Sequence, residues 1–313
     1  MGTTFTAALA MSLNSRVPLV LDGGLGTALE TRGVGLDHDL WSAGLLRDDP
    51  QTLAEVHAAF AAAGADIVTT ASYQLSTRAG LSEAEVRRLA AVSVDIARRA
   101  VAGASLVAGS VGPFGAALGD GSEYTGDYRL TAGEFAAFHR PRIEALAEAG
   151  ADVIALETQP NFAEIRVLAD LAEEVGVPAW LSVTLAAEDA TSPHLPDGTP
   201  LTAIAEVACA HPIIRALGVN CVRPAQVSPA LEALATGTDL PLLAYPNSGE
   251  TYDAETMEWR PAAPPAAEPD DRLGAWPVDH WIDQGARILG GCCRTTPEDI
   301  AALRQSLAAP SRD

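Results

Sequence analysis

The sequence predicts a single-domain α/β protein folded as a (β/α)8 TIM-type barrel. Three observations support this prediction: eight short apolar runs, a helical segment after each run, and a chain of 313 residues. Runs that are apolar on both faces are typical of parallel strands buried on both sides. Their regular alternation with helices predicts a parallel sheet, and this length is normal for a barrel in one domain.

The first predicted strand, PLVLDGG, ends in glycines, and the helical run EVHAAFAAAG stops at a glycine. The predicted strands are residues 18–24, 66–73, 105–112, 152–158, 178–185, 214–221, 241–248 and 286–293. The predicted helical segments are residues 55–64, 82–101, 133–150, 162–176, 201–211, 228–237, 278–286 and 296–309. An open, doubly wound sheet is the alternative, but LDGGLGT lacks the GxGxxG spacing of a dinucleotide-binding turn.

Residues 1–15 have no basic region and no clear cleavage site, so they do not predict a secretory signal. We expect a loose N-terminal extension there and a barrel domain over residues 16–313. Two long segments interrupt the alternation, 113–130 after the third strand and 249–276 after the seventh. Because both follow a strand, both should lie on the face where barrel enzymes carry their active sites.

The formal net charge of −21, from 41 acids and 20 bases, disfavours binding to nucleic acids and to anionic membrane surfaces. No apolar run approaches the roughly 20 residues of a membrane span. We therefore expect small-molecule substrates, a cytoplasmic location, and neither a nucleic-acid nor a membrane partner. The oligomeric state, monomer or homodimer, stays open.

The four cysteines, in a chain of this size, do not form the dense framework of a disulfide scaffold. Adjacent cysteines such as Cys292 and Cys293 bridge each other only with severe strain. Metal ligation or redox chemistry is the better explanation for this pair. Cys209 lies alone on a helical segment, and we expect it to pack in the core.

Three of the thiols fall at strand ends: Cys221 ends the sixth predicted strand, and Cys292 and Cys293 end the eighth. The carboxyl ends of barrel strands meet on one rim. Three thiolates plus one open position is the coordination of a catalytic zinc ion (Zn2+). The sequence therefore predicts that these cysteines hold zinc. Gly290 and Gly291 would let the backbone pass close to the metal.

The segments GGCCRTTP (290–297) and GVNC (218–221) resemble the homocysteine S-methyltransferase family. The resemblance covers roughly residues 18–307 and includes LDGGLGT, ASYQ, GSVGPFGA and ALETQPNFAEI. DGSEYTGDY and YPNSGE resemble the branch that uses S-methylmethionine. The resemblance implies transfer of a methyl group from S-methylmethionine, or S-adenosylmethionine, to the zinc-bound thiolate of L-homocysteine to form methionine.

Two carboxylates fall on the same predicted rim, Asp22 at the end of the first predicted strand and Glu157 at the end of the fourth. In the family, the matching positions hold the amino group of homocysteine. The rest of the amino-acid pocket is expected to come from Gly23, Gly24, Thr27 and Thr158. Asn220 would orient the thiolate of Cys221, and Asn247 would supply an oxygen to zinc when substrate is absent.

A sulfonium donor is a cation, and cations bind to aromatic faces. Trp41, Tyr73 and Tyr124 lie on segments that follow predicted strands, so they are candidates for the donor pocket. Glu123 and Asp127, in the segment at 113–130, are candidates for attracting the positive charge.

Two other classes stay open on the sequence. One is a selenocysteine or other thiol or selenol methyltransferase of the same fold. The other is a non-catalytic zinc- or thiol-binding redox sensor, in which Asp22 and Glu157 would be incidental. Betaine is a less expected donor, because the loop motifs resemble the sulfonium branch.

Overall fold

The computed structural model describes residues 4–35, 44–186, 192–249, 251–253, 258–260 and 276–308. Eight parallel strands form one sheet in the order β1-β10-β7-β6-β5-β4-β3-β2. A parallel bridge between Leu21, next to β1, and Ile67 of β2 joins the two ends of this order and closes the ring. The predicted (β/α)8 barrel is therefore confirmed. Its strands are β1 (Leu19–Val20), β2 (Ile67–Thr69), β3 (Leu106–Val111), β4 (Val153–Gln159), β5 (Ala179–Val183), β6 (Ile214–Asn220), β7 (Leu242–Tyr245) and β10 (Ala286–Leu289).

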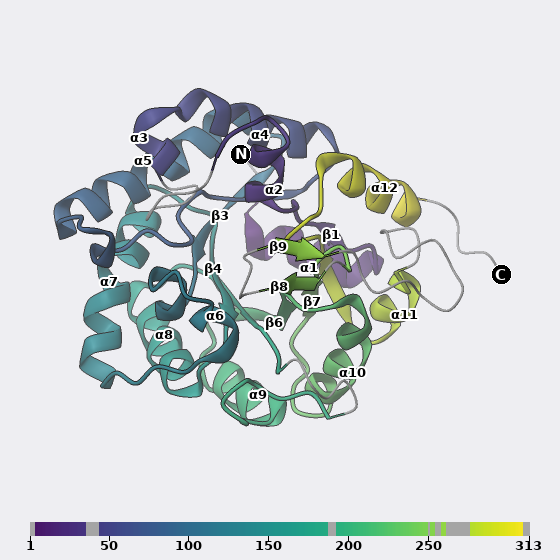
Figure 1. Cartoon of the computed structure of the whole chain (residues 1–313). Helices are drawn as coiled ribbons and strands as arrows, with labels where there is room; N and C mark the ends of the chain where they lie inside the picture. The colour runs from purple at the N-terminus through teal and green to yellow at the C-terminus, as the bar shows by residue number, and fades with distance from the viewer. Residues whose placement is uncertain are drawn as a thin grey trace.

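Helices surround this ring and follow its strands in chain order (Figure 1). Two of the longest helices begin with a capping box, at Ser82 and at Thr131. In each, the hydroxyl oxygen accepts a hydrogen bond from the backbone amide three residues later, and the glutamate at that later position accepts one from the backbone amide of the first residue. The outer helices are α4 (Pro50–Ala62), α5 (Glu83–Val101), α7 (Ala132–Glu148), α8 (Phe162–Val175), α9 (Leu201–Ala210), α10 (Pro224–Ala235), α11 (Val278–Asp283) and α12 (Pro297–Ala308). Shorter helices are α2 (Leu25–Glu30), α3 (Leu45–Asp48), α6 (Ser122–Thr125), η2 (Thr77–Ala79) and η3 (Phe114–Ala117).

The apolar side chains form two main cores. The larger lies between the strands and the outer helices and includes Phe60, Leu181 and Leu231. The smaller includes Trp180 and Ile288 and fills the interior of the ring. Burial on both sides explains why the strands are apolar along their whole length.

Helix α1 (Phe5–Ser15) packs against the barrel and is not the loose extension that the sequence predicted. Phe5 is only 1% exposed, and its ring centroid lies 6.0 Å from that of Trp180. The Ser12 hydroxyl donates to the carbonyl oxygen of Arg287 at 3.2 Å. Because Trp180 and Arg287 lie near the beginnings of β5 and β10, α1 covers the amino end of the barrel, and Figure 1 shows it behind the strands.

The two long segments differ in structure. The segment at 113–130 is folded into η3 and α6, and its Phe114 and Tyr128 pack with Phe135 of α7. Within 249–276, β8 (Thr251–Asp253) and β9 (Glu258–Arg260) pair antiparallel, and most of the remainder lies outside the described residues. Among the described residues, no helix has the length and apolar character that crossing a membrane requires.

Candidate metal centre and adjoining pocket

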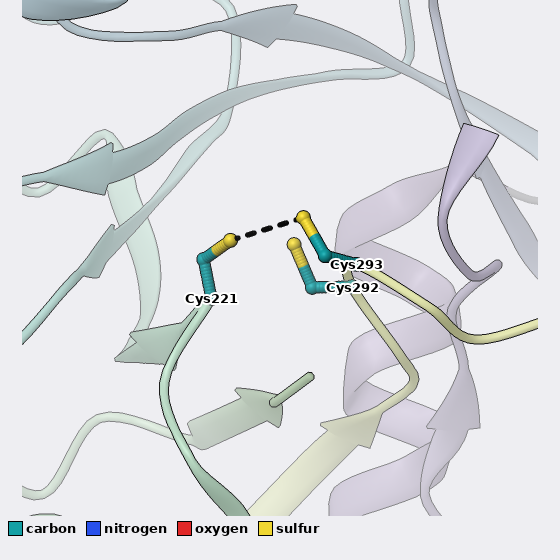
Figure 2. A group of neighbouring side chains, drawn as sticks. All are labelled: Cys221, Cys292 and Cys293. Atoms are coloured by element: carbon teal, nitrogen blue, oxygen red, sulfur yellow. Dashed lines mark hydrogen bonds between the residues drawn. The ribbon is translucent and has the colours of Figure 1, made fainter. Parts of the chain in front are cut away.

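The three predicted metal-binding thiols lie together on the carboxyl rim of the barrel. Cys221 follows β6, while Cys292 and Cys293 follow β10. Their sulfur atoms all lie within 4.8 Å of one another, and Cys221 Sγ is 3.5 Å from Cys293 Sγ. Figure 2 shows the three side chains pointing toward a common point from two loops. The predicted convergence is confirmed, and the role of the thiols as ligands stays a prediction.

The cluster fits a tetrahedral thiolate site. Zinc–sulfur bonds of about 2.3 Å place sulfurs of one tetrahedron about 3.8 Å apart, which is close to the observed spacing. Hydrogen bonds from Cys292 and Cys293 lower the pKa of the Cys221 thiol well below its usual range. The same bonds to Cys221 raise the pKa of Cys292 and of Cys293. The three thiols thus oppose one another's ionisation, and a divalent cation would allow all three to ionise.

Cys209 does not belong to this cluster, and it does not pack in the core as expected. It is exposed on α9, where its sulfur donates to Thr238 Oγ1 at 3.1 Å. Its place on the outside of a helix explains the separation, because the metal-binding thiols lie on loops beyond the strands.

The loop after β7 holds the cysteine loop after β10. The amide of Cys292 donates to the Pro246 carbonyl oxygen at 2.8 Å, and the amide of Cys293 donates to Asn247 Oδ1 at 3.1 Å. The Asn247 oxygen thus accepts a hydrogen bond from the backbone beside the cluster, and its role as a zinc ligand in the absence of substrate stays a prediction. Asn247 fixes the position of the cysteine loop through that bond.

Two glycines let the cysteine loop approach β1. A Cβ on Gly290 would lie 2.6 Å from the Cβ of Leu21, and one on Gly291 would collide with the Thr295 side chain. The close approach that the structure shows is to neighbouring chain, and the approach to a metal stays a prediction. The Gly24 amide, expected to reach a substrate carboxylate, donates instead to the Thr295 carbonyl oxygen and Oγ1, both at 3.1 Å.

Gly23 and Thr27 lie at the same junction. A Cβ on Gly23 would lie 2.7 Å from Thr295 Oγ1, so this position is restricted to glycine by space. The Thr27 hydroxyl oxygen accepts from the Arg294 amide at 2.8 Å. Both residues thus secure the loop that carries the cysteines, and their contact with substrate stays a prediction.

Asp22 is buried on the rim, with 2% of its surface exposed. Its Oδ2 accepts from the Thr69 amide at 2.7 Å, and the Thr69 hydroxyl donates to the same carboxylate. Burial raises the pKa of Asp22 well above its usual range, and the charge of Glu157 raises it further. Two acids that oppose each other's ionisation favour a bound cation between them.

The carboxylate of Glu157 lies in a similar environment. Its carboxylate accepts from the Ser110 hydroxyl and from the Tyr245 hydroxyl, the latter at 3.0 Å. Tyr245 in turn accepts from the indole N–H of Trp180 at 3.1 Å inside the barrel. Burial raises the pKa of Glu157 to about 7.

Sequence reasoning missed the partners of both acids. Thr69, Ser110 and Tyr245 hold them, and each lies at or next to the last residue of its strand. That position was the available signal, because side chains at strand ends reach the rim.

The Asn220 side chain forms its hydrogen bonds with Thr158 rather than with a cysteine. Thr158 has a φ of 60°, which is rare for a β-branched residue. The Asn220 side chain accepts from the Thr158 amide and donates to its hydroxyl, both at 2.7 Å. Asn220 thus holds Thr158 in a strained conformation, and its role in orienting the Cys221 thiolate stays a prediction.

The predicted aromatic candidates divide by location. The Tyr124 hydroxyl lies 3.5 Å from Cys221 Sγ. Burial raises the pKa of Tyr73, the charges of Glu123 and Cys221 raise it further, and a hydrogen bond with the Thr158 side chain lowers it. A Cβ on Gly112 would lie 2.6 Å from the Tyr73 ring, so the glycine makes room for this ring. Trp41 lies outside the described residues.

A buried polar network supports these tyrosines. Arg142 donates to the carbonyl oxygens of Tyr73 at 2.6 Å and Gly112 at 2.8 Å. Its guanidinium also lies 3.0 Å from His139 Nδ1, and His139 Nε2 lies 2.6 Å from Glu164 Oε1. Arginine only donates, so His139 accepts at Nδ1 and carries its proton at Nε2. The network connects α7 and α8 to the segment that bears Tyr73.

The fold and the site define a class: an α/β barrel with a cysteine cluster suited to a metal on its carboxyl rim. Comparison with known proteins narrows this class. The family described as Homocysteine S-methyltransferase matches residues 19–307, which is most of the chain. The chain therefore belongs to the homocysteine S-methyltransferase family.

The similar proteins cover nearly the full chain. A homocysteine S-methyltransferase of Escherichia coli is 46% identical over 91% of this chain and 94% of that protein. YbgG, a homocysteine S-methyltransferase of Bacillus subtilis, is 42% identical over 94% of each. The crystal structure of homocysteine methyltransferase MmuM from Escherichia coli, in its metallated form, gives a TM-score of 0.82 at 43% identity. That match covers 96% of this chain and 99% of the MmuM chain.

Proposed function

We propose that this protein transfers a methyl group from S-methylmethionine to the sulfur of L-homocysteine, with zinc held by Cys221, Cys292 and Cys293. The observation that carries the proposal is the convergence of three thiols beside two buried carboxylates on one rim. A redox sensor would need the thiols and no acid pocket. The family relationship supports homocysteine as the acceptor.

The choice of zinc rests on the ligands. Three sulfur donors with room for a fourth ligand suit a catalytic zinc site. Homocysteine has an ordinary thiol, of which only a few per cent is ionised at pH 7. Zinc bound to the cysteines would supply a positive charge that holds the acceptor sulfur as a thiolate. The cytoplasm is the proposed compartment, because a reducing environment keeps the three thiols available as ligands.

Asp22 and Glu157 bind the acceptor's ammonium group in this proposal. Both are buried and both have a raised pKa, so a bound cation would restore the charge that burial disfavours. Holding the acceptor in this way places its sulfur at the cysteine cluster. Positioning of this kind lowers the barrier of a reaction between two bound molecules.

The donor approaches along Tyr73 and Tyr124. The acceptor sulfur forms a bond to the methyl carbon while that carbon's bond to the donor sulfur breaks, and the leaving group is neutral methionine. No acid or base has to act on the methyl group. The segments DGSEYTGDY and YPNSGE support S-methylmethionine over S-adenosylmethionine as the donor.

A donor panel tests the proposal. Zinc-loaded protein is incubated with homocysteine and, separately, with S-methylmethionine, S-adenosylmethionine and betaine, and methionine is quantified. We expect the fastest formation with S-methylmethionine. If a protein shown to contain zinc forms no methionine with either sulfonium donor, the proposed function is wrong.

The variant Cys292→Ser tests the metal site separately. We expect it to lose bound zinc and activity together, because a serine hydroxyl is a poor zinc ligand. The matched control is Cys209→Ser, which changes an exposed thiol outside the cluster. Retained turnover in Cys292→Ser would refute the assignment of this cysteine.

A further inference from the structure

Glu123 is an acid at the site that no described residue neutralises. It lies on α6 in the segment after β3 and is partly buried. Its Oε2 is shut off from solvent and, within the described parts of the chain, has no hydrogen-bond partner. Burial raises the pKa of Glu123 to about 7, a hydrogen bond from its own backbone amide lowers it, and the negative charges of Cys221 and Asp120 raise it further.

The position of Glu123 is fixed by packing. A Cβ on Gly115 would lie 2.6 Å from the Glu123 amide nitrogen, so α6 lies directly on η3. The next residue, Tyr124, brings its hydroxyl within 3.5 Å of Cys221 Sγ. Glu123 also influences the hydroxyl of Tyr73 through its charge. The carboxylate therefore lies among the aromatic rings that border the cysteine cluster.

A carboxylate with one oxygen shut off from solvent and unpaired is costly, and sites tolerate such a group where a ligand supplies the missing partner. The ammonium of the acceptor already has Asp22 and Glu157 in the proposed function. The donor is the remaining cation, and an acid beside aromatic faces suits a cation.

We propose that Glu123 is the residue that selects a positively charged methyl donor, by pairing its carboxylate with the donor's positive charge. This inference rests on the proposed function for the identity of the reaction. The sulfonium charge disappears as the methyl group leaves, so Glu123 favours the bound donor over the neutral thioether that forms. The residue thus contributes to donor binding and to release of the thioether product.

Steady-state kinetics of Glu123→Gln test the inference, because this change removes the charge and keeps the shape. Assays use zinc-loaded, full-length protein with saturating homocysteine and varied S-methylmethionine. We expect the donor KM to rise about 10- to 100-fold with kcat little changed, since the lost interaction stabilises the donor before transfer. The zinc content and the homocysteine KM should stay at their original values.

The matched control is Glu206→Gln, which makes the same change at an exposed residue of α9, a helix on the outside of the barrel. We expect its donor KM to equal that of the unchanged protein. Equal donor KM values in Glu123→Gln and Glu206→Gln would overturn the inference. A fall in kcat with unchanged donor KM in Glu123→Gln would overturn it as well.

Calorimetric binding provides a test that needs neither turnover nor a folded variant. At pH 8 the unchanged, zinc-loaded protein should bind S-methylmethionine at least tenfold more tightly than its neutral thioether counterpart, methionine. Equal affinities would overturn the inference even in a protein that forms no methionine. Absence of turnover together with selective binding of the cation would instead refute the proposed function alone.

A sulfonium carboxylate that lacks an ammonium group distinguishes the two positive charges of the donor. If Glu123→Gln weakens its binding too, the carboxylate faces the sulfonium. If only S-methylmethionine binds more weakly, the carboxylate faces the donor's ammonium, which the methionine product also carries, and the inference is overturned. Unchanged binding of both compounds in Glu123→Gln overturns it as well.

Discussion

Glu157 is the residue whose ionisation should set the affinity for the acceptor. Burial raises its pKa to about 7, while hydrogen bonds from Ser110 and Tyr245 hold its position. The unfolded chain would ionise this acid near pH 4.5. Between these values the folded protein binds more protons, so the contribution of Glu157 to stability falls as pH rises, by about 3 kcal/mol in total.

Homocysteine binding should show the opposite pH dependence. Pairing with its ammonium needs an ionised Glu157, so we expect the homocysteine KM to rise about tenfold from pH 8 to pH 6. Measuring this KM against pH for the unchanged protein and for Glu157→Gln separates the carboxylate from the acceptor thiol. If both proteins give the same pH profile, Glu157 does not hold the ammonium.

Thr158 and Asn220 illustrate strain at the scale of single residues. Thr158 adopts a φ of 60°, and Cys221 a φ of 54°, on adjacent parts of the rim. The Asn220 side chain bonds both the amide and the hydroxyl of Thr158, and it comes just before Cys221 in the sequence. One asparagine thus connects the ends of β4 and β6 where the two strained residues lie.

At the scale of elements, short contacts between loops place the cysteines. The loop after β10 lies against β1 through Gly290 and Gly291, and against the loop after β7 through Asn247. The β10 strand itself is only four residues long. The loop therefore depends on these contacts rather than on its own strand for its position.

Gly291→Ala should displace this loop and leave the barrel intact. The added Cβ would collide with the Thr295 side chain, so Cys292 and Cys293 should move apart from Cys221. We expect zinc binding at least tenfold weaker with an unchanged circular dichroism spectrum. The matched control is Gly133→Ala on α7, where a Cβ would meet nothing within 4 Å. Equal zinc affinity in the two variants would contradict this role for Gly291.

At the scale of the whole molecule, the two ends of the barrel have separate tasks. The carboxyl rim holds the cysteines, the acids and the tyrosines, whereas α1 covers the amino end through Phe5. Barrel proteins in general divide chemistry and stability between these two faces. Changes to α1 should therefore affect stability without affecting the site.

Phe5→Ala tests this separation. Removing a buried aromatic side chain should lower the free energy of unfolding by about 3–5 kcal/mol, measured by chemical denaturation. The KM for homocysteine and the zinc affinity should not change in the folded protein. The matched control is Met11→Ala on the same helix, where the side chain is 66% exposed and the expected cost is small. A loss of zinc in Phe5→Ala would show that the two ends are coupled.

The positions of the strands, the cysteines at their ends and the acids Asp22 and Glu157 follow from the sequence alone. Apolar runs define parallel strands, and a residue at the end of a strand reaches the carboxyl rim wherever that strand lies in the barrel. Local pattern is enough for these features.

Contacts between distant segments were decided only by the tertiary structure. The pairing of Thr69 with Asp22, of Asn220 with Thr158 and of Phe5 with Trp180 depends on strand register and on how helices pack. The expected loose extension and the core position of Cys209 failed for the same reason. A local pattern shows that a side chain can reach a face, but register and packing decide which neighbour it finds there.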